Sequence, residues 1–196
     1  MSNRIKIEPV DRTIIIRFVR SELRNPLSEG VLSEIHDVLD LAANEERVEQ
    51  IVFTGENGVF ASGADLREID RLSVADAPDF SRLGQALMDR IERCRPITVA
   101  AIDGFCFGGA LDLALACRLR VGSHGSTYCH PGAGLGIITG WGGTQRLPRL
   151  VGEANALEMF FTAEPISAEQ AVRIGLIDRI ATDPTAECLN PLRPPI

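Results

Sequence analysis

The segment from Gly104 to Cys117, GFCFGGALDLALAC, places a glycine pair, Gly108 and Gly109, just before a single carboxylate, Asp112. A helix that begins near Gly109 leaves its first N–H groups without intrahelical acceptors, and its dipole favours negative charge there. Since glycine lets a ligand approach the backbone closely, such an end can stabilise a developing oxyanion by about 3 kcal/mol per donor. The structural alternative is that the two glycines only allow close packing of a strand and a helix.

A second segment of similar character lies earlier in the chain. The sequence VFASGADLREI, Val59 to Ile69, also follows an apolar strand and also presents small residues where a helix is expected to begin. Two such junctions can direct two backbone N–H groups at one oxygen atom. The pair therefore favours a site that stabilises negative charge on an oxygen.

Other glycine and cysteine patterns fail the tests for known sites. GFCFGG lacks the Lys-Ser/Thr end of a P-loop, and GAGLGI has Ile137 where a dinucleotide fingerprint needs its third glycine. GSHGS has His124 at its centre, where the G-x-S-x-G nucleophile elbow of a serine hydrolase needs a serine. The spacing of Cys117, His124, Cys129 and His130 matches no zinc pattern, so we expect no metal site.

Composition narrows the class of protein further. The chain has 196 residues and is 45% hydrophobic, which suits one domain with a proper core, and we place that domain at residues 1–182. A net charge of −7 argues against a nucleic-acid or anionic-membrane partner. The best candidate for a membrane-spanning segment, Ile97 to Leu115, is interrupted by Asp103 and Asp112. The start of the chain has no apolar signal core, and five cysteines without a CxxC pair indicate free thiols, so we expect a cytoplasmic protein.

Apolar periodicity predicts strands that alternate with helices, which is an α/β pattern. The expected strands are 13–19, 48–55, 96–104 and 118–123, and the expected helices are 29–43, 80–91, one that begins near Gly109, 144–150, 154–161 and 168–174. The tail, residues 183–196, ends in LNPLRPPI and is expected to be disordered.

Taken together, FASGADLREI, AAIDGFCFGGALDLALAC, GWGGTQRLPRLVG and SAEQAVRIGLIDRI resemble, in this order, the enoyl-CoA hydratase/isomerase (crotonase) family. The resemblance runs from about Thr13 to Ile180. It implies a spiral of ββα turns that binds an acyl-CoA thioester as its partner, a trimer or hexamer, and no cofactor beyond the coenzyme A of the substrate. The thioester oxygen would lie between the N–H groups of Ala64 and Gly109, and Ser62 and Arg24 would hold the adenine end of coenzyme A.

The sequence departs from this family at the acidic residues. Family hydratases hold a water between two glutamates, which here fall on Asp112 and on Gly132 in YCHPGAGLG. His130, two residues away, can reach the same face of an extended loop and is one substitute, although a hydrogen-bonded core histidine is the alternative. If Gly132 leaves a void, a Gly132→Glu variant is expected to restore the second acid.

Two further comparisons with the family leave the activity open. Naphthoate synthases also carry a glycine at the second acid position, where a bound bicarbonate is thought to act, but this chain has Thr139 where they carry a further aspartate. The chain also ends before the usual C-terminal helical extension. The sequence thus favours hydration of a 2-enoyl-CoA, with another enolate reaction (isomerisation or decarboxylation) and an acyl-CoA-binding or assembly subunit as alternatives.

Overall fold

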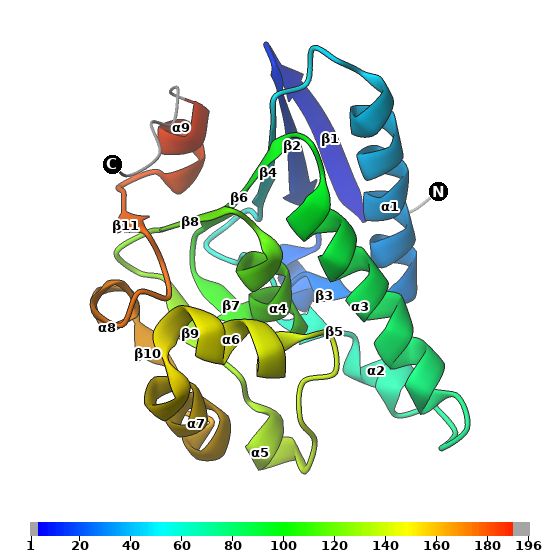
Figure 1. The fold of residues 1–196 in the computed structure, drawn as a ribbon, viewed down its shortest axis with the longest axis vertical. Coiled ribbons are helices and arrows are strands. Elements are labelled where there is room, and N and C mark those ends of the chain that lie inside the picture. Colours follow the sequence, from blue (N-terminus) through cyan, green and yellow to red (C-terminus); the bar gives the residue numbers. More distant parts are fainter. Residues whose placement is uncertain (1–3, 190–196) are drawn as a thin grey trace.

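The computed structural model describes residues 4–189 and has an α/β architecture around one main sheet (Figure 1). The first two strands of that sheet are antiparallel and the others run parallel. In spatial order the strands are β1 (Ile5–Val10), β2 (Thr13–Phe18), β4 (Gln50–Thr54), β6 (Ile97–Ile102), β8 (Leu119–Gly122) and β11 (Arg179–Ile180). The nearly continuous apolar character of β4 and β6 matches strands covered on both faces.

Each of four successive main-sheet strands is followed by a second, shorter strand and then by a helix. The short strands are β3 (Pro26–Leu27), β5 (Gly63–Ala64), β7 (Phe105–Phe107) and β9 (Thr127–Cys129), and β10 (Ile166–Ser167) pairs with β9. The helices are α1 (Glu29–Asn44), α2 (Leu66–Ile69), α3 (Ala77–Arg93), α4 (Gly109–Ala116) and α5 (Gly132–Leu135). The expected spiral of ββα turns is therefore confirmed.

Five further elements complete the described part of the chain. They are the short 3-10 helix η1 (Ser21–Leu23) and the helices α6 (Gly143–Val151), α7 (Glu153–Thr162), α8 (Ala168–Arg173) and α9 (Pro184–Leu189). Among residues 4–189, no helix is long and apolar enough to cross a membrane.

Helix α9 corrects the expectation of a disordered tail over residues 183–196. Cys188 packs with Ile15, Val52 and Val99 on the face of the main sheet opposite to α4, and the Gln50 side chain donates to its carbonyl over 2.7 Å. A small apolar face on the sequence PTAECL is enough to cover this part of the sheet. Residues 190–196, which carry the proline-rich part of the tail, lie outside the described residues.

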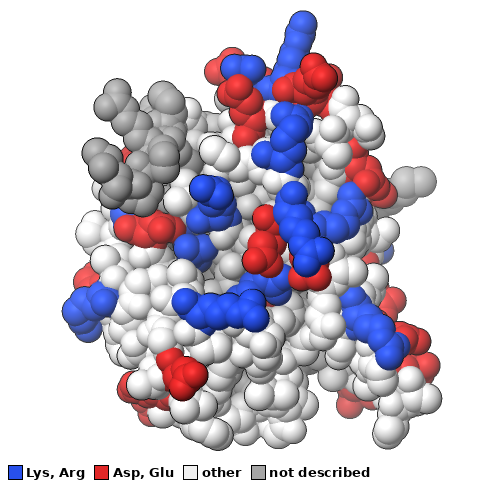
Figure 2. Space-filling model, in the orientation of Figure 1, with Lys and Arg blue, Asp and Glu red and all other residues white. Residues whose placement is uncertain are grey.

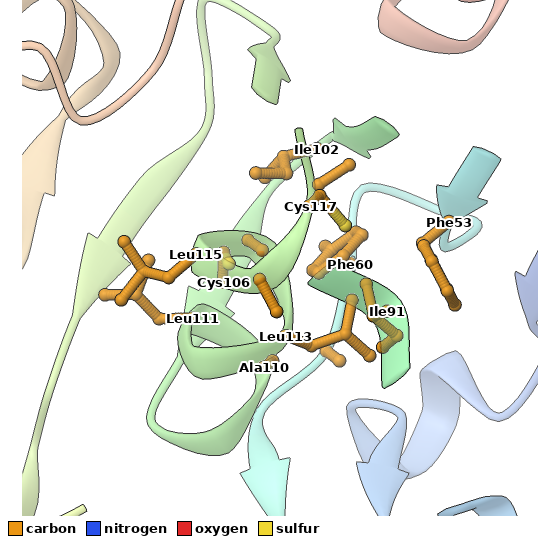
Figure 3. Packing of buried hydrophobic residues seen from close by; sticks show 14 of the residues in the cluster. Phe53, Phe60, Ile91, Ile102, Cys106, Ala110, Leu111, Leu113, Leu115 and Cys117 are labelled. Carbon is orange, nitrogen blue, oxygen red and sulfur yellow. The ribbon is translucent and has the colours of Figure 1, made fainter. Parts of the chain in front are cut away.

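Helix α4 lies in the centre of the core, which explains why its sequence is apolar on every side (Figure 3). Leu111 and Leu115 point to one side of the helix, while Leu113 points toward Phe60 and Ile91. All five cysteines are free thiols, and every one except Cys94 is buried. Asp112 is thus the single carboxylate on a helix whose other residues are glycine, alanine and leucine.

Candidate active site

The two glycine-bearing junctions meet at the start of α4. A Cβ atom on Gly63 would lie 2.8 Å from the nitrogen of Gly109, and a Cβ atom on Gly109 would lie 3.2 Å from the nitrogen of Ala64. Since a residue's own Cβ lies roughly 2.5 Å from its nitrogen, the Ala64 and Gly109 nitrogens are at most about 6 Å apart. That spacing lets one oxygen atom accept from both N–H groups at about 3 Å.

The pairing of β3 with β5 leaves the Ala64 N–H directed away from the sheet. Pro26 lies opposite Gly63 in this parallel pair and has no N–H, so the ladder must use the N–H and the carbonyl of Gly63. Successive N–H groups of an extended strand point to opposite sides, and the Ala64 N–H therefore points away from β3.

The Gly109 N–H is available for a different reason. Gly109 is the first residue of α4, where an N–H has no intrahelical acceptor. The preceding turn is fixed because Gly108, with a φ of 54°, donates its own N–H to the Cys129 carbonyl over 2.8 Å. A left-handed turn at this point favours glycine.

Asp112 lies one helical turn further along and is completely buried. Its Oδ2 accepts a hydrogen bond from the Thr139 hydroxyl, whereas its Oδ1 has no hydrogen-bond partner within residues 4–189. Burial raises the pKa of Asp112 to about 7. The Thr139 hydrogen bond opposes that rise, as do the Arg146 charge and the nearby backbone N–H groups of Trp141 and Gly143.

His130 is the second polar side chain buried beside this carboxylate. Its Nε2 lies 3.7 Å from Oδ1 of Asp112, and its ring packs against Phe160 with a centroid separation of 5.0 Å. Neither ring nitrogen has a hydrogen-bond partner in the described part of the chain. Burial lowers the pKa of His130 to about 4, so the ring is neutral at ordinary pH.

A close approach of the backbone completes this cluster. A Cβ atom on Gly143 would lie 2.1 Å from Oδ1 of Asp112 and 3.1 Å from Cε1 of His130. Only glycine lets the start of α6 approach the two side chains this closely.

Gly132 leaves no void, contrary to the possibility raised by the sequence. A Cβ atom there would lie 2.5 Å from the carbonyl oxygen of Ile137, because the loop folds back and the Ile137 N–H donates to the Gly132 carbonyl over 3.0 Å. A Gly132→Glu side chain would clash with the Ile137 backbone, so this variant is not expected to raise activity.

Five of the six residues chosen from sequence line a pocket of about 320 Å³. These are Ser62, Ala64, Gly109, Asp112 and Gly132. The rest of the wall is mainly apolar and includes Leu66, Phe80, Leu135, Ile137, Ile138 and Trp141. The surface over α5, which belongs to this wall, carries few charged side chains (Figure 2). The pocket suits a ligand with a hydrocarbon part and one polar centre.

Arg24 does not line this pocket. Its carbonyl accepts the Ser62 N–H over 2.9 Å, and its guanidinium lies 6.0 Å from the centre of the Phe105 ring. The structure thus places the exposed Arg24 beside the loop that contains Ser62 and Gly63, outside the pocket.

Sequence reasoning missed two residues that shape the site. Gly143 is needed for close packing on Asp112, and Trp141 fits between two helices at positions where both have glycine. A Cβ atom on Gly84 of α3 would lie 2.0 Å from the Trp141 ring, and one on Gly109 of α4 would lie 2.5 Å from it. The motif GWGG was the available signal, since glycines beside a large aromatic residue indicate close packing.

Comparison with known proteins agrees with this geometry. The family model described as enoyl-CoA hydratase/isomerase matches residues 11–190. A crotonyl-CoA hydratase from Syntrophomonas wolfei is 36% identical over 90% of this chain and 68% of its own length. A short-chain-enoyl-CoA hydratase from Clostridium acetobutylicum is 33% identical over 91% of this chain and 69% of its own length.

Solved structures show the same fold. The crystal structure of an enoyl-CoA hydratase from Bacillus anthracis superposes with a TM-score of 0.91 at 28% identity, covering 95% of this chain and 74% of that protein. The residues that the family model matches, 11–190, include the ββα spiral from β2 onward and the segments that line the pocket. The chain belongs to the enoyl-CoA hydratase/isomerase family.

Proposed function

We propose that this protein is an enoyl-CoA hydratase, which adds water across the double bond of a 2-enoyl-CoA thioester. The observation that carries the proposal is the position of Asp112, buried one helical turn from the Gly109 N–H and in the same pocket as Ala64. The related crotonyl-CoA and short-chain-enoyl-CoA hydratases support the choice of substrate.

Hydration needs stabilisation of the charge that forms on the thioester oxygen. When a water molecule adds to C3 and gives up one of its protons, electrons move to that oxygen and give an enolate, which the N–H groups of Ala64 and Gly109 would bind. Each such donor typically contributes about 3 kcal/mol to the transition state. The enolate must then receive a proton at Cα, and Asp112 is the buried carboxyl group close enough to supply it.

The pocket gives the acyl chain a hydrocarbon environment, and the outer side of the site would hold coenzyme A. Ser62 lies in the pocket wall, and its N–H donates to the carbonyl of Arg24 outside the pocket. These two residues are therefore proposed to contact the adenine end of coenzyme A. The proposed hydration requires no coenzyme besides the coenzyme A that is part of the substrate. A cytoplasmic location and a trimeric or hexameric assembly are also proposed, from the free thiols and the family resemblance respectively.

The direct test measures the loss of crotonyl-CoA with purified protein, together with the binding of saturated butanoyl-CoA by calorimetry. We expect the unmodified protein to hydrate crotonyl-CoA. We expect the Asp112→Asn variant to lose this turnover but to bind butanoyl-CoA as before. Binding of butanoyl-CoA without any hydration by the unmodified protein would refute the proposal and indicate an acyl-CoA-binding subunit.

A further inference from the structure

The site contains one carboxylate for work that requires two proton-transfer steps. Hydration removes a proton from water and delivers a proton to Cα, and Gly132 has no side chain for either step. The nearest other titratable side chain in the pocket wall is His130, with Nε2 at 3.7 Å from Oδ1 of Asp112. This distance is too long for a direct hydrogen bond, so the two buried atoms lie side by side in the pocket wall without satisfying each other.

We propose that His130 is the second acid–base group of the hydration, and that its Nε2 takes the proton of the attacking water while Asp112 protonates Cα. This inference rests on the proposed hydratase function and assigns a role that a glutamate plays elsewhere in the family. His130 and Asp112 come from different turns of the spiral, since β9 leads to His130 and α4 carries Asp112.

The unpartnered nitrogens of His130 argue against a purely structural role. A structural histidine in a core is expected to hydrogen-bond through its ring, because an unsatisfied buried polar group destabilises the fold. His130 is 3% exposed, and neither nitrogen has a partner in residues 4–189. The described groups next to its ring are Asp112, the Phe160 ring and the backbone of Gly143, and none of them occupies Nδ1 or Nε2.

The protonation states of the pair decide which group is acid and which is base. Burial raises the pKa of Asp112 to about 7 and lowers the pKa of His130 to about 4, which reverses the usual order of the two residues. Below about pH 7 the proton of the resting pair therefore lies on Asp112, and the imidazole is free to accept one. Environments that move two pKa values apart in this way are typical of acid–base pairs.

The proton balance closes within one turnover. The water oxygen forms a bond to C3 while one of its O–H bonds breaks, and that proton moves to Nε2 of His130. The C2–C3 π electrons pass through the enolate to form a C–H bond at Cα with the proton of Asp112. The resulting imidazolium and carboxylate face each other, and transfer of a proton from Nε2 to Oδ1 through the next water restores the resting state.

The test compares two reactions that use the site differently. The first is hydration of crotonyl-CoA, which needs both groups. The second is exchange of the Cα protons of butanoyl-CoA in D₂O near pH 8, where ionised Asp112 removes a Cα proton, the N–H groups hold the enolate, and no water attacks C3. His130→Gln keeps a polar group near the Nε2 position but cannot accept a proton, and His124→Gln on the exposed surface is the matched control.

We expect His130→Gln to lower kcat for hydration by a factor of about 10² to 10⁴, with little change in KM, while Cα exchange stays within a few-fold of the unmodified protein. Asp112→Asn should lose both reactions, and His124→Gln should lose neither. If the glutamine variant no longer binds butanoyl-CoA, the same two rates are measured in His130→Asn.

Two results would overturn the role of His130. One is hydration that stays within a few-fold in a variant that binds butanoyl-CoA. The other is an equal fall of hydration and exchange, because it would mean that His130 only positions Asp112. A different outcome, unmodified protein that does not hydrate crotonyl-CoA, would refute the hydratase function itself and His130's role in it.

Discussion

Replacement of Asp112 by asparagine should change how the stability of the protein depends on pH. Burial raises the pKa of this carboxyl from 3.8 to about 7, so the folded protein holds the proton more tightly than the unfolded chain does. Stability is therefore highest, as far as this group is concerned, below about pH 4. It falls as the pH rises toward 7 and stays low above that.

The size of the effect follows from the same two values. The interval from 3.8 to about 7 spans about three pH units, and each is worth about 1.4 kcal/mol, which gives about 4 kcal/mol in total. About 1.5 kcal/mol of this is already lost at pH 5. Since asparagine does not titrate, the stability of Asp112→Asn relative to the unmodified protein should rise by about 3 kcal/mol between pH 5 and pH 8.

Urea unfolding at several pH values between 5 and 8 measures this difference directly. A constant offset from the new amide group, which must fit among the surrounding N–H groups, does not alter the slope with pH. His130 is present in both proteins, so its own titration largely cancels. Asp37→Asn, on the exposed face of α1, serves as the control for loss of a carboxylate. A difference between Asp112→Asn and the unmodified protein that stays flat from pH 5 to pH 8 would refute the reasoning.

Three further substitutions test the backbone and the surroundings of Asp112. Ala64→Pro removes one N–H donor at a position that already has a Cβ atom, and kcat for crotonyl-CoA should fall by a factor of about 10² to 10³; an unchanged kcat would exclude this N–H. Gly143→Ala puts a methyl group 2.1 Å from Oδ1 of Asp112, so we expect loss of turnover and about 1–3 kcal/mol lower stability by urea unfolding. Thr139→Val removes the hydroxyl that lowers the pKa of Asp112, so the fall of kcat/KM at high pH should move to higher pH; a shift to lower pH would contradict the assignment of Asp112 as the acid.

The sequence predicted the parts of the site that depend on local structure. Glycines at 63 and at 108–109 mark the two junctions, because tight turns and close backbone approach both favour this residue. The α/β pattern was likewise visible in the apolar periodicity. Helix α9 was missed because its apolar face is short and proline-rich sequence follows it.

The parts that depend on contacts between distant segments could not be read from the sequence. The pairing of β7 with β9 brings His130 to Asp112, and sequence spacing alone does not give the distance between them. The absence of a void at Gly132 depends on the fold of the loop up to Ile137. Thr139 was noted only as a missing aspartate, whereas its hydroxyl contacts the one carboxylate present.

The position of Trp141 between α3 and α4 has a consequence for how this site can evolve. Its ring occupies the space that side chains at Gly84 and Gly109 would need, so neither glycine can mutate alone without a clash. A smaller residue at 141 would open that space and make alanine acceptable at 84. We therefore expect positions 84 and 141 to change together among relatives, with the loss of the tryptophan coming first.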